Sequence, residues 1–335
     1  SIPERITEKI LEPISESESE SKTDSPTINV AICGIAKDIA WNIKSLRNQF
    51  DKLGKIIPVK VIIYENNSTD DTAVLLKEWA STTSNITIKS ELLSDDDLRK
   101  CTISRNIYGK PAKEELKCVA RNKLLDMIAS SEFDIISHVI LMDLHNQNSI
   151  PIHKIAHYIQ NPPIEYDCMI CNGIDHNGRL QDLSSYRCEL YPFGPEVLGS
   201  EFWTNNHRNL ACESIMYNQV YRHVYSAYNG MCIIKKPALK DLRFSVLPTP
   251  TLDTFYRVRC DKLVIPTNYQ YNDVLLGMYM FENHSIFYLM NSGVNLPLVN
   301  MFSTFFLDMR KNGFEKIMIN PNLIWKWYVS SFTVI

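Results

Sequence analysis

The chain has 335 residues, of which 45% are hydrophobic and 22% are charged, and this composition is ordinary for a soluble globular protein. Its 35 basic and 38 acidic residues give a net charge of −3, which argues against a protein that binds nucleic acid through bulk charge. No apolar run reaches the length of about 18 residues that is typical of a membrane span.

The sequence lacks the motifs of several common enzyme classes. Only 11 glycines are present, and none forms the G-x-G pair of a dinucleotide-binding fold. The two G-xxxx-G spacings begin at Gly173 and Gly194, and neither is followed by the Lys-Ser/Thr of a phosphate loop. The motifs G-x-S-x-G, H-E-x-x-H and H-x-E, which are typical of hydrolases, zinc proteases and deaminases, are also absent.

Residues 1–27 differ in composition from the rest of the chain. Serine and glutamate alternate within SESESESK without an apolar period, which is typical of a solvated tail or stem. The chain begins with Ser rather than Met, which leaves open that an upstream signal or membrane anchor was removed. The folded domain is therefore expected at 28–335.

From residue 28 onward, strand and helix patterns alternate. Continuous apolar runs predict buried strands, and apolar residues at helical spacing predict the helices between them. The predicted order is strand 28–35, helix 39–53, strand 58–64, helix 73–80, helix 115–128 and strand 134–143. Thr69 or Asp70 is expected to cap the second helix. This rhythm predicts a parallel sheet, which binds ligands at the carboxyl ends of its strands.

The nine cysteines are spread through apolar segments rather than clustered in loops. Cys168 and Cys171 lie in YDCMICNGI, a predicted strand whose alternation sends the two side chains to opposite faces of the sheet. Buried, reduced thiols are therefore expected, in preference to a redox or zinc pair.

Groups that could bind a ligand follow each predicted strand. The first strand ends near Gly34 and Asp38, the turn Glu65–Asp70 follows the second, and Asp143–Asn146 follows the third. Because the carboxyl ends of parallel strands meet at one edge of a sheet, we expect these groups to face a common cleft. The first two residues of the ENNSTD turn are expected within about 10 Å of Asp143.

The polar turn in IIYENNSTDDT and the later D-L-H group resemble the nucleotide-sugar glycosyltransferases of the GT-A fold. More closely, the chain resembles the fungal capsule-associated α-1,3-mannosyltransferase family over about residues 28–325. The further matches, in chain order, are Ala120-Arg121-Asn122, Asp182–Arg187, Val224–Gly230 and GFEKIMINPNL. The sequence departs from the family where His145 replaces the second Asp of D-x-D and where Tyr228 replaces Trp.

This resemblance implies an α/β protein of the GT-A fold, with a Rossmann-like, mostly parallel central sheet flanked by helices. It implies a nucleotide-binding half at 28–146 and an acceptor half at 147–335. The expected activity is that of a hexosyltransferase, which moves a hexose from a nucleotide-diphospho-sugar to a hydroxyl of a glycan or glycoconjugate. GDP-mannose is the first choice of donor and retention the expected stereochemistry, although UDP-sugars fit the same frame.

Such a reaction needs a divalent cation on the diphosphate, bound by one or two carboxylates and by phosphate oxygens. Asp143 is the expected carboxylate ligand, with His145 beside it and His284 as a later ligand. Either Mn²⁺ or Mg²⁺ would serve, and a histidine ligand favours Mn²⁺. The alternatives are a helix cap for Asp143, a loop residue for His145 and a core histidine for His284.

The candidates for binding the nucleotide come from the first half of the chain. Glu65 could accept a hydrogen bond from a nucleobase N–H, and Asp38 or Asn66 could accept from ribose hydroxyls. The same turn is also a good helix start, which is the alternative. Lys117 and Arg121 share one helix face and could meet the diphosphate, or they could form a solvated basic face.

Backbone geometry supplies further candidates for the donor site. Gly34 stands at the end of the first predicted strand. Tyr228, Asn229 and Gly230 are expected to line the same cleft as Asp143, with Gly230 allowing the backbone to approach the sugar closely.

The oxocarbenium-like centre of the reaction needs a negative charge nearby. The candidates for this carboxylate are Glu282, Asp182 and Asp273, and Glu282 ranks first because His284 beside it could anchor the donor phosphates. Replacing Asp143 by Ala is expected to abolish transfer and to leave the fold intact.

Two other functions remain open. A sugar nucleotidyltransferase would need a Gly-rich, basic loop, and CGIAKDIAWN after the first strand is neither. A catalytically inactive glycosyltransferase-like binding protein would explain the altered D-L-H group. Glycosylation sequons at Asn66 and Asn67 fall in the proposed nucleotide turn, where a glycan would block the site. A cytoplasmic location is therefore favoured over the Golgi lumen, which is the alternative if an N-terminal anchor was removed.

Overall fold

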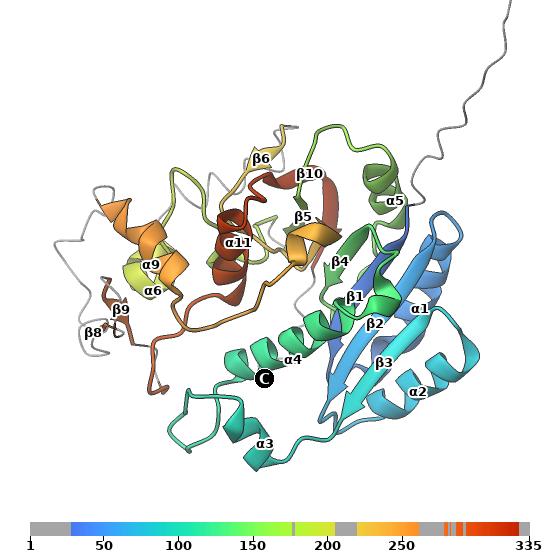
Figure 1. Ribbon diagram of the computed structural model, residues 1–335, viewed down its shortest axis with the longest axis horizontal. Helices are drawn as coiled ribbons and strands as arrows, with labels where there is room; N and C mark the ends of the chain where they lie inside the picture. Colours follow the sequence, from blue (N-terminus) through green and yellow to red (C-terminus); the bar gives the residue numbers. More distant parts are fainter. Residues whose placement is uncertain are drawn as a thin grey trace, which may run out of the picture.

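The computed structural model describes residues 28–175, 178–204, 220–260, 278–280, 282, 286–290 and 293–327. In this part of the chain, an eight-stranded mixed sheet has the strand order β3-β2-β1-β4-β7-β5-β10-β6 (Figure 1). Its strands are β1 (Val30–Ala36), β2 (Val59–Asn66), β3 (Ile86–Glu91), β4 (His138–Met142), β5 (Cys168–Ile174), β6 (Arg222–His223), β7 (Met231–Lys235) and β10 (Ile317–Lys326). A separate two-stranded sheet pairs β8 (Met278–Tyr279) with β9 (Tyr288–Leu289).

The sheet is mostly parallel, as the alternation of strands and helices predicts. β1 pairs in parallel with both β2 and β4, β2 with β3, and β5 with β10. β7 lies antiparallel between β4 and β5, and β6 lies antiparallel at one edge. The carboxyl ends of β1, β2, β3, β4, β5 and β10 therefore share one edge of the sheet, where β7 begins.

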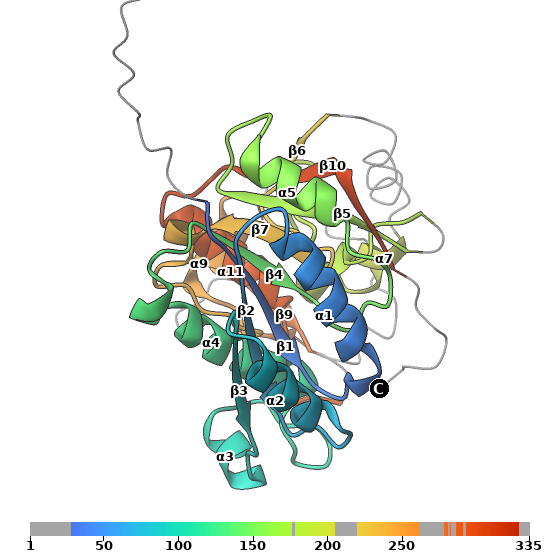
Figure 2. The ribbon, with the colours of Figure 1, turned by 90° about the vertical axis from the view of Figure 1, so that its right-hand side faces the viewer.

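Helices cover both faces of the sheet (Figure 2). One face packs against α1 (Ala40–Gly54), α2 (Thr72–Thr82) and α5 (Ile152–Gln160), and the other against α4 (Lys113–Ile128) and α11 (Met301–Lys311). The other helices and single turns are α3 (Asp95–Lys100), α6 (Pro195–Leu198), α7 (Ser200–Thr204), α9 (Pro250–Arg257), η1 (Ser131–Phe133), η2 (Leu183–Ser185) and η3 (Lys236–Leu239). Every helix among the described residues is too short or too polar to span a bilayer.

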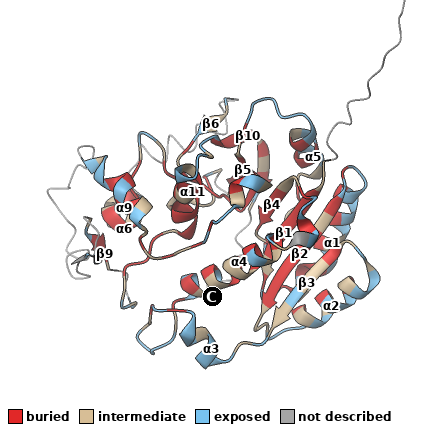
Figure 3. Cartoon of the chain, in the orientation of Figure 1, coloured by how far each residue is buried: buried red, intermediate tan, exposed pale blue. Residues whose placement is uncertain are grey.

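Both faces of the sheet are buried, which explains the continuous apolar runs of its strands. Along β1, Val30 and Ile32 face the core on the side of α1, whereas Ala31 and Cys33 face the core on the side of α4. Figure 3 shows the buried residues on the strands and on the inward sides of the helices. The architecture is therefore a mixed α/β fold with a mostly parallel central sheet flanked by helices.

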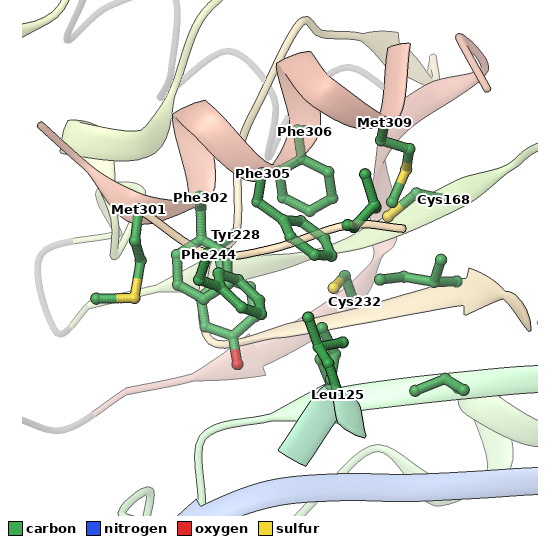
Figure 4. Packing of buried hydrophobic residues seen from close by; sticks show 14 of the residues in the cluster. Leu125, Cys168, Tyr228, Cys232, Phe244, Met301, Phe302, Phe305, Phe306 and Met309 are labelled. Carbon is green, nitrogen blue, oxygen red and sulfur yellow. The ribbon is translucent and has the colours of Figure 1, made fainter. Parts of the chain in front are cut away.

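Aromatic side chains fill the space between α11 and the sheet (Figure 4). Phe244 stacks on Phe305 with ring centroids 4.2 Å apart, and Tyr228 stacks on Phe302 at 3.6 Å. All four are buried, and each buried aromatic ring contributes on the order of 2 kcal/mol through the loss of its hydration. This layer fixes α11 over the strand ends where the polar groups gather.

The predicted cysteine geometry is confirmed. Cys168 belongs to the core beside α4 and α11, and Cys171 belongs to the core beside α1. Both thiols are buried and unpaired by disulfides, and burial raises the pKa of Cys171 above its ordinary range. The two residues are therefore packing residues of opposite faces.

One local expectation differs from the structure, and the expectation that Asp70 caps the second helix is confirmed. The third predicted strand begins at His138 rather than at residue 134, because its partner β1 begins at Val30, which pairs with His138. The residue before α2 is Asp71, whose side chain makes no capping bond. The Asp70 carboxylate instead accepts from the N–H of Thr72, at 3.0 Å, and from the N–H of Ala40, at 3.0 Å. One carboxylate thus caps the first turns of both α1 and α2.

Candidate active site

The centre of the carboxyl edge is where β4 ends and β7 begins. Met142 pairs with Met231, so the residues just beyond each strand end face each other. The N–H of Asp143 donates to the carbonyl oxygen of Gly230 at 2.9 Å. Residues that are far apart in the sequence are therefore joined at the middle of the sheet.

A pocket of about 300 Å³ opens at this point, a size that suits a small-molecule site. It brings together residues from α4, from the end of β4, from the turns before η2 and β7, and from the start of α11. The lining residues are Glu114, Lys117, Arg121, Asp143, Gln181, Asp182, Tyr228, Gly230, Val246, Val299, Asn300, Met301 and Phe302. The expectation that Tyr228 and Gly230 share a cleft with Asp143 is confirmed by this lining.

Asp143 is held by two donors on the same carboxylate oxygen. Its Oδ1 accepts from Arg121 Nη2 at 3.0 Å and from the Tyr228 hydroxyl at 3.2 Å. Within the described residues, Oδ2 accepts no hydrogen bond, and the Asp143 side chain is 29% exposed. One oxygen of the carboxylate is therefore fixed by the protein, and the other is available to a ligand in the pocket.

Arg121 is the buried partner of this ion pair. Its side chain is only 7% exposed, and its guanidinium carbon lies 4.7 Å from the centroid of the Phe302 ring. Burial alone would lower the pKa of Arg121, but Tyr228 and Asp143 together raise it above its ordinary value. Arg121 therefore stays cationic and orients Asp143. Burial raises the pKa of Tyr228, so its hydroxyl stays protonated and can donate.

The expectation that Asp143→Ala leaves the fold intact stays a prediction, and this pair adds that the variant should be less stable than the wild type. That expectation treats Asp143 as an exposed group. In the structure, Asp143 is the counter-ion of the buried Arg121 guanidinium, and removing it would leave a buried charge without a partner. Asp143 also does not cap the next helix, because α5 begins after Pro151.

Asp182 brings a second carboxylate to the pocket. Its Oδ1 accepts from the Ser184 hydroxyl at 2.6 Å and from the N–H of Ser185 at 3.2 Å, and it caps η2. Asn300 Nδ2 donates to the same Ser184 hydroxyl at 2.8 Å, which ties η2 to the start of α11. Asp182 is therefore held in a fixed position, and its Oδ2 accepts no hydrogen bond within the described residues.

The turn before β7 requires unusual backbone conformations. Asn229 and Gly230 have φ angles of +56° and +90°. A Cβ on Gly230 would lie 2.2 Å from Cζ2 of Trp327, so glycine is needed for space as well as for conformation. Asn229 is fully buried, and its Nδ2 donates to the carbonyl oxygen of Cys171 at 3.1 Å. Asn229 thus shapes the turn and does not itself line the pocket.

Four of the predicted nucleotide-binding residues do not line this pocket. Glu65 is 2% exposed, and its carboxylate accepts from the N–H of Ser68 and from the Ser90 hydroxyl. The other three are likewise engaged within the protein. Asp38 accepts from Thr69, Asn66 donates to Asn67, and the space beside Gly34 is filled by Leu144.

Glu65 lies at the same edge of the sheet as Asp143, as the sequence predicts. β2 and β4 both pair with β1, so their carboxyl ends are two strand spacings apart, or about 10 Å. Glu65 therefore lies near the pocket as a structural residue that joins β2, β3 and the following turn.

The remaining candidate residues, two metal ligands and two catalytic carboxylates, do not line the pocket or lie outside the described residues. His145 is exposed, its Nε2 lies 3.0 Å from the carbonyl oxygen of Lys37, and it does not line the pocket. Glu282 is exposed and does not line it either. Asp273 and His284 lie outside the described residues.

The donor set of the pocket bears on metal binding. Among the described residues, no group of three or more His, Cys, Asp or Glu side chains is close enough to form a metal site. The pocket nevertheless offers free oxygens on Asp143 and Asp182. This set fits a hard cation that takes one or two protein carboxylates and completes its shell with phosphate and water.

A second cluster of charges lies at the end of β3. Glu91 forms ion pairs with Lys89, at 3.1 Å, and with Lys123 of α4, and it accepts from the Tyr64 hydroxyl at 2.6 Å. Burial alone would raise the pKa of Glu91, but these partners together lower it to about 2. This cluster fastens α4 to the sheet.

Several pocket residues are not among the sequence candidates, and these include Glu114, Gln181 and Asn300. Asn300 carries a local signal, because an Asn before the apolar run MFSTFF is typical of a helix N-cap, and its side chain does accept from the N–H of Phe302. That signal predicts the helix start but not its position over η2, which depends on tertiary packing.

The sequence matches no family model and no curated protein. Similar solved structures include Staphylococcus aureus TarS 1–349 in complex with UDP, with 16% identity over 65% of this chain and 50% of that chain, at a TM-score of 0.37. The mannosyltransferase PcManGT from Pyrobaculum calidifontis in complex with GDP-Man and Mn²⁺ has 13% identity over 67% and 48%, at a TM-score of 0.35.

Glucosyl-3-phosphoglycerate synthase from Mycobacterium tuberculosis, in complex with Mn²⁺, UDP and phosphoglyceric acid, has 15% identity over 71% of this chain and 65% of that chain, at a TM-score of 0.34. The chain thus spans about half the length of the TarS and PcManGT chains that it matches. The similarity is low in both sequence and superposition.

Proposed function

We propose that the chain is a glycosyltransferase that moves a hexose from a nucleotide-diphospho-sugar to a hydroxyl of a glycan or glycoconjugate. The observation that carries this proposal is the presence in one pocket of two carboxylates with free oxygens, on Asp143 and Asp182, together with the Lys117 ammonium. Opposite charges arranged in this way suit a substrate whose leaving group is anionic and whose reacting carbon becomes positive.

Asp143 is the proposed ligand of the divalent cation, through Oδ2. Arg121 and Tyr228 hold Oδ1, so the free oxygen is presented to the pocket in one orientation. When bound, Mn²⁺ or Mg²⁺ would neutralise the diphosphate leaving group. Lys117, which lines the pocket one helical turn before Arg121, is the proposed cationic contact of the same diphosphate.

Asp182 is the proposed carboxylate nearest the reacting sugar carbon. Of Asp182 and Glu282, the two sequence candidates within the described residues, Asp182 is the one that lines the pocket, and its capping bonds to η2 hold it in place. A fixed negative charge beside the sugar would stabilise the oxocarbenium-like transition state. Glu282 and Asp273 stay as predictions, as do the choice of mannose and the retaining outcome.

The test measures donor hydrolysis and sugar transfer with a panel of GDP- and UDP-hexoses in the presence of Mn²⁺. Asp182→Asn keeps an oxygen to cap η2 but removes the charge, and it should lower turnover by about 10²-fold or more at unchanged stability. Asp51→Asn makes the same change at an exposed carboxylate of α1, away from the pocket, and as the matched control it should retain turnover.

Two results would count against the proposal. If Asp182→Asn keeps full turnover, Asp182 is not the reacting-centre carboxylate. If the wild-type chain binds a nucleotide sugar but neither hydrolyses nor transfers it, the chain is a catalytically inactive, glycosyltransferase-like binding protein.

A further inference from the structure

The segment between α3 and α4 protrudes from the molecule. α3 and the residues after it extend beyond the carboxyl end of β3 and lie at the lower edge of the molecule in both views (Figures 1 and 2). We call residues 101–112 the α3–α4 loop. It leads directly into α4, whose first two turns contribute Glu114 and Lys117 to the pocket.

The loop displays large apolar side chains to solvent. Ile107 is 75% exposed, Tyr108 is 79% exposed, and Ile103 is 58% exposed. Ile107 and Tyr108 stand side by side at the tip of a tight turn. Exposed apolar residues are common singly, but three within six positions form a patch that suits a binding surface.

The turn at the tip is held by its own hydrogen bonds. Asn106 donates its backbone N–H to the carbonyl oxygen of Lys110 at 2.7 Å, and its own carbonyl accepts from Gly109 at 2.8 Å. Its side-chain Oδ1 also accepts from the N–H groups of Tyr108, at 2.9 Å, and Lys110, at 3.0 Å. The backbone polar groups of the turn therefore have hydrogen-bond partners within the turn, and the turn holds the apolar side chains toward solvent.

The base of the loop is anchored to the rest of the protein. The buried Glu115 carboxylate accepts from the N–H groups of Ile103 and Ser104, each at 2.9 Å. Arg105 donates its backbone N–H to Asn295 Oδ1 at 2.6 Å, and its carbonyl accepts from Asn295 at 2.9 Å. The loop is thus tied to α4 on one side and to the segment before α11 on the other.

Basic residues predominate in the stretch of chain that contains the apolar tip. From Leu98 to Lys113 the sequence has five basic residues and no acidic residue. The Arg105 guanidinium donates to backbone carbonyls of Thr102, Ser104 and Arg99, so this charge is used in hydrogen bonds that hold the loop together. The other basic residues of the stretch, all exposed, are Arg99, Lys100, Lys110 and Lys113. The acidic residues that flank the stretch are Asp95, Asp96 and Asp97 at the start of α3, and Glu114 and the buried Glu115 in α4.

We propose that the α3–α4 loop is a docking surface for an anionic lipid membrane. Ile103, Ile107 and Tyr108 would enter the boundary between headgroups and acyl chains, and the lysines around them would meet lipid phosphates. A protein partner is less favoured by this composition, because lysine is depleted in protein–protein interfaces. Lysine side chains suit a lipid surface, since their stems bury along apolar groups while the ammonium stays hydrated.

Docking through this loop has a geometric consequence for the pocket. Because the loop continues into the first turns of α4, the pocket wall formed by Glu114 and Lys117 would lie close to the lipid headgroups. A substrate carried in the membrane would then reach the pocket without leaving the lipid surface.

The test is co-sedimentation of the full chain with vesicles of phosphatidylcholine mixed with phosphatidylserine, and with vesicles of phosphatidylcholine alone. The wild type should bind the mixed vesicles and bind the neutral ones much less. The double variant Ile107→Ser/Tyr108→Ser should bind the mixed vesicles at least about tenfold less, since two apolar side chains no longer insert. Lys100→Gln/Lys110→Gln should lose about fivefold per removed charge.

Matched controls replace the same residue types elsewhere on the surface. Val74→Ser/Leu190→Ser removes two exposed apolar side chains, and Lys52→Gln/Lys55→Gln removes two exposed charges, away from the loop. Both should bind like the wild type, and circular dichroism should be unchanged for all variants. Absence of binding to the anionic vesicles, or equal binding by the loop variants and the controls, would overturn the proposal.

Discussion

Replacing Asp143 by Asn removes the negative charge beside Arg121 and keeps an oxygen that can accept from Arg121 and Tyr228. The buried guanidinium is then left without a counter-ion. Breaking a buried ion pair costs about 3–5 kcal/mol, and the 29% exposure of Asp143 places this pair near the lower value, about 3 kcal/mol. With an unfolding entropy of about 2.1 cal/mol/K per residue over 335 residues, this loss lowers Tm by about 4 °C.

The opposite replacement, Arg121→Met, should cost less. Asp143 would be left unpaired, but water can solvate it, and methionine can fill much of the space against Phe302. We expect a loss of about 1 kcal/mol, or about 1–2 °C in Tm. The double variant should be no less stable than Asp143→Asn alone, because the two replacements remove the same interaction.

Thermal unfolding followed by circular dichroism measures all three variants. We expect an asymmetry, in which replacing Asp143, the more exposed partner of the pair, lowers Tm more than replacing Arg121. If Arg121→Met lowers Tm more than Asp143→Asn, or if the two losses simply add, then the charge of Asp143 does not compensate the buried guanidinium.

Two further predictions concern the elements around the pocket. Glu91 has a pKa lowered from its ordinary 4.5 to about 2, so its contribution to stability is complete above pH 4.5 and is lost as the pH falls towards 2. Between these two pH values, the Tm of Glu91→Gln should therefore fall less than the Tm of the wild type. The control Asp126→Asn breaks an exposed ion pair, and its Tm should follow that of the wild type. Gly230→Ala should lose more stability in urea unfolding than Gly313→Ala. Both glycines have φ near +90°, which costs an alanine about 1 kcal/mol, but of these two positions only 230 would bring the new Cβ against another group, the Trp327 ring. Equal losses for the two variants would show that Trp327 moves aside freely.

The sheet and the convergence of the pocket could be predicted because they depend on local patterns. Continuous apolar runs mark β1, β2 and β4, and parallel pairing sends their carboxyl ends to one edge. Asp143 follows directly from that rule. Gly230 follows from the polar turn before the apolar run of β7, although the antiparallel insertion of β7 has no local signal.

The rest of the site depends on contacts between distant segments. The polar turn after β2 predicts Glu65 as a nucleotide ligand, but in the structure its carboxylate accepts a hydrogen bond from the Ser90 hydroxyl on the neighbouring strand. The sequence around Asn300 predicts a helix cap, but not its hydrogen bond to Ser184, which lies more than a hundred residues earlier in the chain. Asp182 is distinguished from Glu282 by packing, since both are single carboxylates in polar segments.

The place of β7 in the sheet has a consequence for synthesis of the chain. β7 lies between β4 and β5 although it follows both in sequence. During translation, β1 to β4 can pair as soon as they emerge, but the second edge of β4 waits for about 90 further residues, or roughly 5–18 s at ordinary elongation rates. For that time the nascent chain carries an unpaired apolar strand at the future centre of the sheet, the kind of edge that pairs wrongly with other chains. A chain truncated before Met231 would therefore be prone to aggregation, and a chaperone that shields this edge would raise the yield of folded protein.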